Sequence, residues 1–205
     1  MIIKLFARGL IIGLAVAAPV GPIGMLVIRR TLAYGRMLGL LTGLGAAAAD
    51  ALYGCVGAFG LTFVSGFLLG HALWTNLLGG LFLCYLGIGT FRSNPGENGG
   101  SVTHAHHAAA FLSALLLTLA NPITILSFMA IFAGLGLGTG GGGYGAATTV
   151  VAGVFLGSAL WWVILSGGIS LVKHRLKPGA MRWINRISGA FLFSFGALAL
   201  SGLAR

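Results

Sequence analysis

One carboxylate stands out in this sequence because it lies inside an apolar segment of membrane-spanning length. Asp50 is one of only two acidic residues, the other being Glu97, and no charged residue follows it until Arg92. A carboxylate near the bilayer centre costs at least ~2.5–3.5 kcal/mol on insertion scales, so intramembrane acids usually serve function. Because no basic residue falls in the interior of a predicted span, we expect Asp50 to bind a cation or a proton. The alternative is a protonated Asp50 that only hydrogen-bonds a neighbouring helix.

A second group of residues consists of prolines and glycines that must interrupt a helix. Pro19 and Pro22 lie three residues apart, with Gly21 and Gly24 beside them. Proline removes a backbone donor and clashes with the preceding turn, and non-helical backbone at membrane depth survives only against protein or a water-lined cavity. The pattern therefore predicts a substrate site, where helix N-termini offer positive dipole ends and unwound carbonyls offer acceptors. A simple packing kink is the alternative.

A matching break is predicted in the second half of the chain. Residues 22–26 align with residues 122–126 at an offset of 100, and Asn121 precedes the second proline. Corresponding interruptions in two halves are expected at a binding site on a repeat interface. The predicted substrate-binding residues are therefore Asp50, Pro19, Gly21, Pro22, Gly24, Asn121 and Pro122.

Apolar segments of spanning length must position these residues. Only 7% of the 205 residues are charged and 58% are hydrophobic, which excludes an ordinary soluble domain and a disordered chain. The expected spans cover residues 9–28, 38–59, 70–91, 111–134, 148–171 and 186–204. Halves with an odd number of spans must insert in opposite orientations. We therefore predict an all-α integral membrane protein with six transmembrane helices, arranged as two inverted three-helix repeats in which helices one and four are broken.

The expected division of the chain follows its one clearly polar stretch. We expect residues 1–92 to form the first three-helix repeat, 93–110 a polar cytoplasmic loop, and 111–205 the second repeat, together one membrane domain. The loop carries three histidines, at positions 104, 106 and 107. They could coordinate a metal, but we interpret them as part of a solvated linker and predict no metal site.

The N-terminus resembles a secretory signal peptide, because Lys4 and Arg8 precede an apolar run and a small-residue pattern. The apolar run continues to Arg29, so we expect it to be retained as the first helix. Nine of the twelve basic residues fall in the loops on one side of the predicted topology. The positive-inside rule then places both termini outside, in the periplasm of a bacterial inner membrane.

The remaining patterns concern assembly and excluded functions. Glycines at four-residue spacing, such as Gly9/Gly13 and Gly153/Gly157, predict close helix packing within the bundle, with homodimerisation as the lesser alternative. A net charge of +10 would suggest nucleic acid in a soluble protein, but here the basic residues lie between apolar runs, and we predict no nucleic-acid partner. The sequence has no Ser-His-Asp order, phosphate loop or CxxC, so we predict no enzyme activity and no cofactor.

The stretch from Pro19 to Gly60 resembles the lysine exporter (LysE/RhtB) superfamily of amino-acid exporters. The motifs that carry the resemblance are Pro19-x-Gly21-Pro22, Arg29-Arg30 with Gly35-Arg36 in a cytoplasmic turn, Gly43-x-Gly45 followed by Asp50, Gly57-x-x-Gly60, Leu86-Gly87 and Asn121-Pro122. The resemblance implies a six-helix secondary exporter that expels amino acids in exchange for protons. Ile23 and Ile123 stand where many relatives have a polar residue and a lysine.

These departures leave the substrate open. Efflux of a metal or another cation is the alternative within the superfamily, and a non-transporting membrane scaffold is the alternative outside it. Our expectation is that the carboxylate of an amino acid binds at broken-helix N-termini near Gly21–Gly24 and Asn121–Pro122. Its ammonium, or an exchanged proton, binds at Asp50, so the expected partners are an amino acid, protons and the lipid bilayer.

Overall fold

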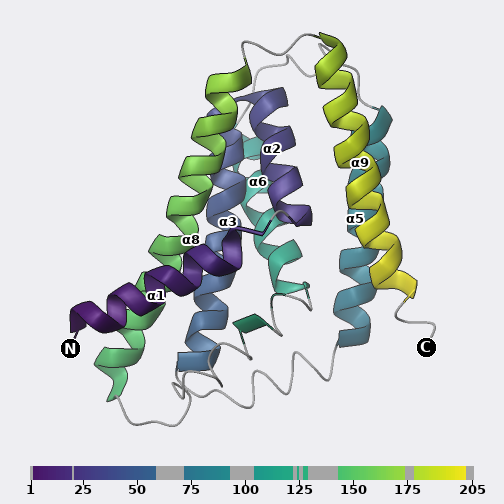
Figure 1. The fold of residues 1–205 in the computed structure, drawn as a ribbon. Coiled ribbons are helices and arrows are strands. Elements are labelled where there is room, and N and C mark those ends of the chain that lie inside the picture. The colour runs from purple at the N-terminus through teal and green to yellow at the C-terminus, as the bar shows by residue number, and fades with distance from the viewer. Residues whose placement is uncertain are drawn as a thin grey trace.

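The computed structural model describes residues 2–19, 21–58, 72–92, 104–121, 124, 127–128, 143–173 and 178–201. Across these residues every regular element is an α-helix, which confirms the all-α prediction. The helices are α1 (Ile2–Ala17), α2 (Pro22–Tyr34), α3 (Arg36–Ala58), α5 (Ala72–Arg92), α6 (His104–Leu119), α8 (Gly143–Lys173) and α9 (Pro178–Ser201). Figure 1 shows an upright bundle with α1 lying obliquely across its lower part.

Among the described helices, α3 and α8 are each long and apolar enough to cross a membrane alone. The pair α1 and α2 passes the same test together as one broken span, bent by 79° at the break. The expected spans 38–59, 70–91 and 148–171 overlap α3, α5 and α8 closely. The first expected span, 9–28, is instead divided into two helices that together extend from Ile2 to Tyr34.

The break between α1 and α2 has the local cause that the sequence predicted. The Ala18 amide makes the last helical bond of α1, to the Leu14 carbonyl at 2.9 Å, and the Gly21 amide donates to the Pro19 carbonyl at 2.9 Å. The second of these bonds closes a tight three-residue turn. Pro22 then begins α2 at a position where a missing N–H costs nothing, because the first amides of a helix have no intrahelical acceptor.

The turn from α2 to α3 depends on Gly35. Its φ of 97° lies in the left-handed region that favours glycine, and its amide donates to the Thr31 carbonyl at 3.0 Å. Gly35 alone therefore ends α2 and allows α3 to begin at Arg36. We call this end of the bundle, which holds Gly35 and Arg36, the arginine end.

The start of α6 differs from the sequence expectation. The histidines at 104, 106 and 107 were placed in a loop, whereas α6 begins at His104. The reason is that alanine, the best helix former, fills much of the stretch up to residue 110, and the apolar run follows without a helix-ending residue. The continuation of the expected span 111–134 beyond Leu119 lies largely outside the described residues.

Glycines set the closest helix contacts. A β-carbon on Gly9 or Gly13 would overlap the carbonyls of Val150 and Val154, which brings α1 directly against α8. In the same way, a β-carbon on Gly45 of α3 would overlap a backbone carbonyl of α6. Small residues permit such approach of helix backbones in lipid. The prediction that the four-residue glycine spacing serves packing within the bundle is confirmed for the α1–α8 contact.

The pair α5 and α9 stands at one side of the bundle (Figure 1), and the two helices pack chiefly on each other. Gly87 faces Gly189 and Gly80 faces Gly196 across their contact. Apart from α5, the helix that α9 chiefly contacts is α2. The described fold therefore consists of a body, formed by α1, α2, α3, α6 and α8, and a helix pair beside it.

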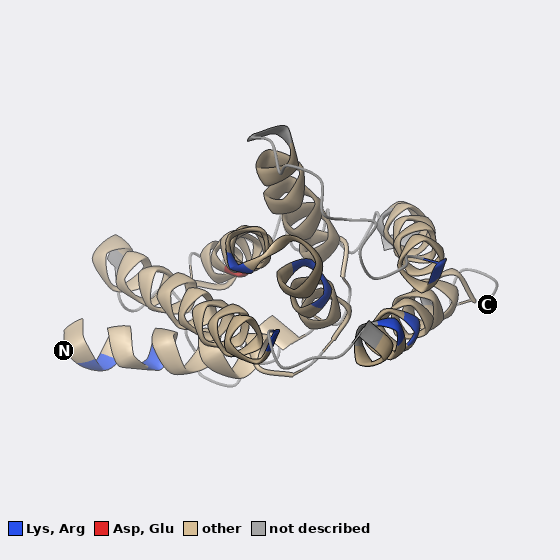
Figure 2. Cartoon of the chain, turned by 90° about the horizontal axis from the view of Figure 1, so that it is seen from above, with Lys and Arg blue, Asp and Glu red and all other residues tan. Residues whose placement is uncertain are grey.

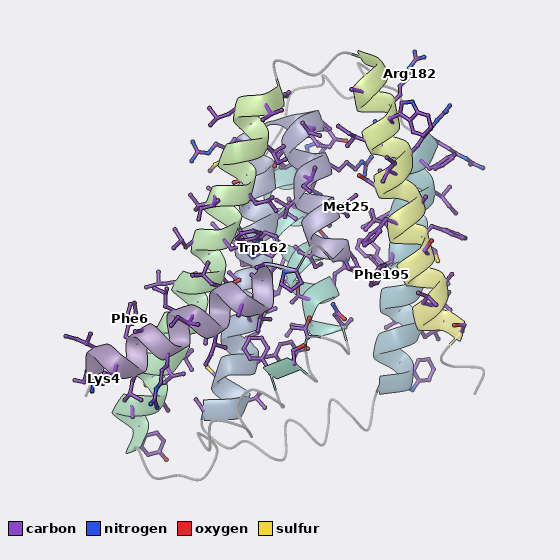
Figure 3. All side chains as sticks on the ribbon, in the orientation of Figure 1. Lys4, Phe6, Met25, Trp162, Arg182 and Phe195 are labelled. Atoms are coloured by element: carbon purple, nitrogen blue, oxygen red, sulfur yellow. The ribbon has the colours of Figure 1, made fainter. Side chains whose placement is uncertain are left out.

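Charged residues and buried side chains are arranged along the length of the bundle. Figure 3 places Arg182 at the arginine end and Lys4 toward the opposite end, where α9 also finishes. Seen from above in Figure 2, the described Lys and Arg residues are spread over several helices. The apolar core has two parts. One contains Leu26, Val27 and Trp162, and the other, farther from the arginine end, contains Tyr53 and Val154.

Candidate functional site

A cavity of about 70 Å³ lies where α1 gives way to α2. This volume holds a few water molecules and is well below the ~300–1,000 Å³ of most small-molecule pockets. Of the seven residues that the sequence singled out, six line this cavity: Pro19, Gly21, Pro22, Gly24, Asp50 and Asn121. The seventh, Pro122, lies outside the described residues. Residues separated by about one hundred positions in the chain are thus brought together.

Further side chains complete the lining. The remaining lining residues are Val16, Ala17, Ile23, Ala46, Thr118, Thr124 and Trp162. Trp162 belongs to the apolar core, where it is 3% exposed, and also lines the cavity, whereas its neighbour Trp161 packs against the apolar core. Figure 3 shows Trp162 at the centre of the bundle, near the level of the α1–α2 break.

Asp50 lies at the crossing of α3 and α8 and is 3% exposed. The Ser158 hydroxyl donates a hydrogen bond to Asp50 Oδ2 at 2.6 Å, and Trp162 Nε1 donates to the Ser158 hydroxyl at 3.1 Å. Ser158 and Trp162 are four residues apart and therefore share one face of α8. The three side chains form a hydrogen-bonded chain that ends on the carboxylate and begins at a residue of the cavity wall.

The N-terminus of α2 faces the same cavity. Gly21 caps the helix without a side-chain hydrogen bond, and the Met25 amide closes the first turn on the Gly21 carbonyl at 3.1 Å. The amides of Ile23 and Gly24 belong to the first turn of α2, where backbone N–H groups have no acceptor within the helix. A β-carbon added at Gly21 would meet nothing within 4 Å. This corner therefore offers a positive helix end with open space in front of it.

The end of α6 contributes acceptors. The Asn121 amide donates to the Thr118 carbonyl at 3.1 Å, and the Tyr53 hydroxyl donates to the Leu119 carbonyl at 2.6 Å. We expected a helix N-terminus at Asn121–Pro122. Pro122 lies outside the described residues, which show the C-terminal end of α6 before it and a helical Thr124 after it. Carbonyl oxygens at such an end carry partial negative charge, so this side of the cavity suits a cation or an ammonium group.

Arg30 corrects a further expectation. The sequence placed Arg29 and Arg30 in a cytoplasmic turn, but α2 continues to Tyr34, and both residues are half-buried on this helix. Arg30 donates to the Thr42 hydroxyl of α3 at 3.1 Å, and to the Ala110 carbonyl and Ser113 hydroxyl of α6 at 3.0 and 2.9 Å. Its guanidinium therefore joins three helices between the cavity and the arginine end.

Sequence reasoning missed Ser158, Thr118 and the partners of Arg30. Hydroxyl residues in apolar helices usually bond to their own backbone, so composition gives no sign of them. One signal was present: Ser158 follows Gly153 by five residues, just as Asp50 follows Gly45, and both glycines lie against neighbouring backbones. Within the residues that the structure describes, no three His, Cys, Asp or Glu side chains are grouped so as to hold a metal ion.

A buried carboxylate in a cavity between broken helices is typical of membrane transporters, and comparison with known proteins gives the same class. The family described as LysE type translocator matches residues 14–202. The chain therefore belongs to this family of membrane transporters, which are not enzymes, and it is a multi-pass membrane protein. The superfamily resemblance drawn from the sequence motifs is confirmed.

Individual relatives extend the comparison. The chain is 28% identical over 198 residues to the Bacillus subtilis (strain 168) protein named "Putative amino acid efflux protein YcgF", covering 94% of this chain and 93% of the relative. It is 31% identical over 173 residues to the Escherichia coli (strain K12) protein named "Uncharacterized membrane protein YahN", covering 82% of this chain and 77% of the relative. No solved structure matches the chain.

Proposed function

We propose that this transporter exports amino acids across the cell inner membrane in exchange for protons. The observation that carries the proposal is the pairing of Asp50 with the N-terminus of α2 in one cavity. An amino acid presents an ammonium and a carboxylate on the same carbon, so its site needs an acceptor and a positive donor close together. The name of the Bacillus relative, an amino acid efflux protein, supports the same substrate class.

Each half of the substrate has a partner in this arrangement. The carboxylate binds the amides of Ile23 and Gly24, because a helix N-terminus favours an anion. The ammonium binds Asp50, with carbonyls at the end of α6 as further acceptors. Since the cavity of about 70 Å³ is small, the described conformation is a closed one, and the helices must separate to admit substrate.

Proton exchange follows from the isolation of Asp50. Its carboxylate is buried, and an unpaired charge in an apolar interior is costly. Asp50 therefore holds either a proton or the ammonium of the substrate, and the two compete for one site. This competition couples the export of an amino acid to the uptake of a proton.

We also propose that residues 1–92 and 111–205 act as two inverted repeats that flank the polar segment 93–110. Matched contacts support this arrangement. A β-carbon on Gly45 would meet the Phe111 carbonyl and Leu115 amide, and one on Gly153 would meet the Phe6 carbonyl and Leu10 amide. Helix α3 thus contacts α6 in the same way as α8 contacts α1. Rocking of such repeats against each other opens a central substrate site to one side of the membrane and then to the other.

The test is efflux from proteoliposomes loaded with the twenty proteinogenic amino acids under a pH gradient, detected by mass spectrometry. We expect wild-type protein to release one or a few of these amino acids. Asp50→Asn should reduce the release to that of loaded liposomes without protein. Asparagine keeps the size and hydrogen-bonding capacity of aspartate but cannot take up a proton or carry charge. Asp50→Glu retains the charge, so we expect partial release with a shifted pH dependence.

Ser158→Ala provides a matched control because it removes the hydrogen bond to Asp50 but leaves the carboxylate. We expect this variant to be slower than wild type and still dependent on the pH gradient. Wild-type rates from Asp50→Asn would make Asp50 a structural residue and remove the proton-coupling proposal. Release of no amino acid by the wild type would remove the substrate class and favour cation efflux or a scaffold.

A further inference from the structure

The three partners of Arg30 are all neutral. Thr42 and Ser113 supply hydroxyl oxygens and Ala110 a carbonyl oxygen. The Thr42 hydroxyl gives its own proton to the Leu38 carbonyl at 2.8 Å, and the Ser113 hydroxyl gives its proton to the Ala110 carbonyl. Both hydroxyls therefore present lone pairs to the guanidinium, and within the described part of the chain Arg30 is held without a compensating negative charge.

The chain has little negative charge with which to compensate Arg30. Its only acidic side chains are those of Asp50 and Glu97, and Glu97 lies outside the described residues. Asp50 follows Thr42 by eight residues on α3, which corresponds to about 12 Å along the helix. A half-buried charge with only neutral partners is costly and marks a functional site by default when it lies in a membrane bundle.

Arg30 also lies in line with the cavity. Ile23 lines the cavity seven residues before Arg30 on α2, and Ala46 lines it four residues after Thr42 on α3. Spacings of four and seven residues keep side chains on one helix face and displace them by about 6 and 10 Å. Three of the helices that line the cavity, α2, α3 and α6, thus also hold the guanidinium, one to two turns nearer the arginine end.

We propose that Arg30 binds the carboxylate of the substrate at the arginine end, before the substrate reaches the cavity. This inference rests on the proposed amino-acid export. Thr42 and Ser113 hold the empty guanidinium in the closed conformation, and the incoming carboxylate replaces them. A carboxylate adds an opposite charge that the neutral oxygens of Thr42, Ser113 and Ala110 lack, and the planar fork of arginine matches both carboxylate oxygens. Exchange of partners releases α3 and α6 from α2 and opens this end.

The test compares amino acids with their carboxamides, which keep the ammonium and the side chain but lack the carboxylate. Proteoliposomes containing the full chain are loaded with equal amounts of the twenty amino acids and their twenty amides. Initial efflux of each is measured by mass spectrometry below saturation, and the ratio of acid to amide is taken for each side chain. Arg36→Gln is the matched control, because Arg36 is an exposed arginine at the same end.

In the wild type we expect the exported amino acid to leave faster than its amide. In Arg30→Gln the ratio should fall about 10-fold or more, because the carboxylate loses its charged and planar partner; a factor of ten corresponds to ~1.4 kcal/mol. Arg36→Gln and Glu97→Gln should leave the ratio unchanged. Arg30→Lys, which keeps the charge but not the planar fork, should give an intermediate ratio.

The two proposals fail differently. If wild-type protein exports no amino acid, both fall. If it does and Arg30→Gln slows acid and amide equally, Arg30 is only a structural link between helices and this inference is overturned. If Arg30→Gln does not fold, Arg30→Lys decides, since a wild-type ratio there also overturns the proposal. A loss of selectivity in Glu97→Gln equal to that in Arg30→Gln would make Glu97, and not the substrate, the partner of Arg30.

Discussion

The cavity has two boundaries along the bundle, and they differ in chemistry. Toward the arginine end, Arg30 is bound by hydrogen bonds to two hydroxyls and a carbonyl. On the other side, the core contains Ile12, Tyr53, Phe128 and Val154. The hydroxyl of Tyr53 is bonded to the Leu119 carbonyl, and its ring lies 5.8 Å from that of Phe128. We call these the polar closure and the apolar closure.

The difference indicates how each closure can open. A hydrogen-bonded closure opens when its donor exchanges one acceptor for another, and a substrate carboxylate can supply the new acceptor. An apolar closure offers nothing for a charged substrate to replace, so it separates only when the helices themselves move. The polar closure therefore suits recognition of an incoming substrate, whereas the apolar closure suits a barrier that stays shut against ions until the helices move.

The first prediction decides which closure faces the cytoplasm, and its outcome is all-or-none. A reporter fused after Arg205 should be active only outside, and one inserted near Gly99 only inside, because nine of twelve basic residues fall on one side of the proposed topology. Compartment-specific reporters such as alkaline phosphatase and a fluorescent protein make the measurement. A cytoplasmic C-terminus would place the polar closure outside, away from the side on which an exporter receives its substrate.

The second prediction concerns the α3–α6 contact that both closures share. Gly45→Ala would drive a β-carbon into the Phe111 carbonyl, and overpacking of this kind costs about 1–3 kcal/mol or more. Gly54→Ala is the matched control, since its β-carbon would lie 3.7 Å from Val151 and Val154, an ordinary contact distance. Thermal unfolding in detergent should show a large decrease of the midpoint temperature for Gly45→Ala and not for Gly54→Ala. Equal midpoints would mean that α3 and α6 are farther apart than described.

The third prediction weakens the polar closure directly. Thr42→Val keeps the side-chain shape but removes an acceptor from Arg30, and a hydrogen bond to a charged group contributes ~1.5–3 kcal/mol. Thr31→Val is the control, because the described bond of its hydroxyl stays within α2, to the Val27 carbonyl at 2.7 Å. We expect Thr42→Val to lower the unfolding midpoint more than Thr31→Val does. The reverse order would contradict a closure held by Arg30.

The fourth prediction has the smallest expected effect. Tyr53→Phe removes one neutral hydrogen bond from the apolar closure but keeps the ring against Phe128, which should cost ~1 kcal/mol. Tyr85→Phe, on a ring that is 73% exposed, is the control and should have almost no effect on unfolding. If Tyr53→Phe lowered the stability to unfolding more than Thr42→Val does, the apolar closure would depend on polar contacts.

The sequence predicted the parts of this site whose chemistry is local. The α1–α2 break follows from two prolines three residues apart, and the burial of Asp50 follows from the apolar run around it. Ser158 could not be found in this way, because its role depends on how α8 is placed against α3, and that register is set by glycine contacts between helices. Arg30 was assigned to a turn because the paired arginines end the apolar run, whereas the residue that ends α2, Gly35, lies five positions farther along the chain.

The chain from Trp162 through Ser158 to Asp50 has a direction, and this has a consequence for α1. A serine hydroxyl has one proton, which Ser158 gives to Asp50 Oδ2. A proton on Oδ2 would let Asp50 donate to the Ser158 hydroxyl, which could then accept from both Asp50 and Trp162 and turn its own proton to another acceptor. For a helical serine that acceptor is the carbonyl one turn back, here that of Val154, which packs directly against Gly13. In the proposed exchange, binding of one proton at Asp50 would therefore change a hydrogen bond at the contact between α8 and α1.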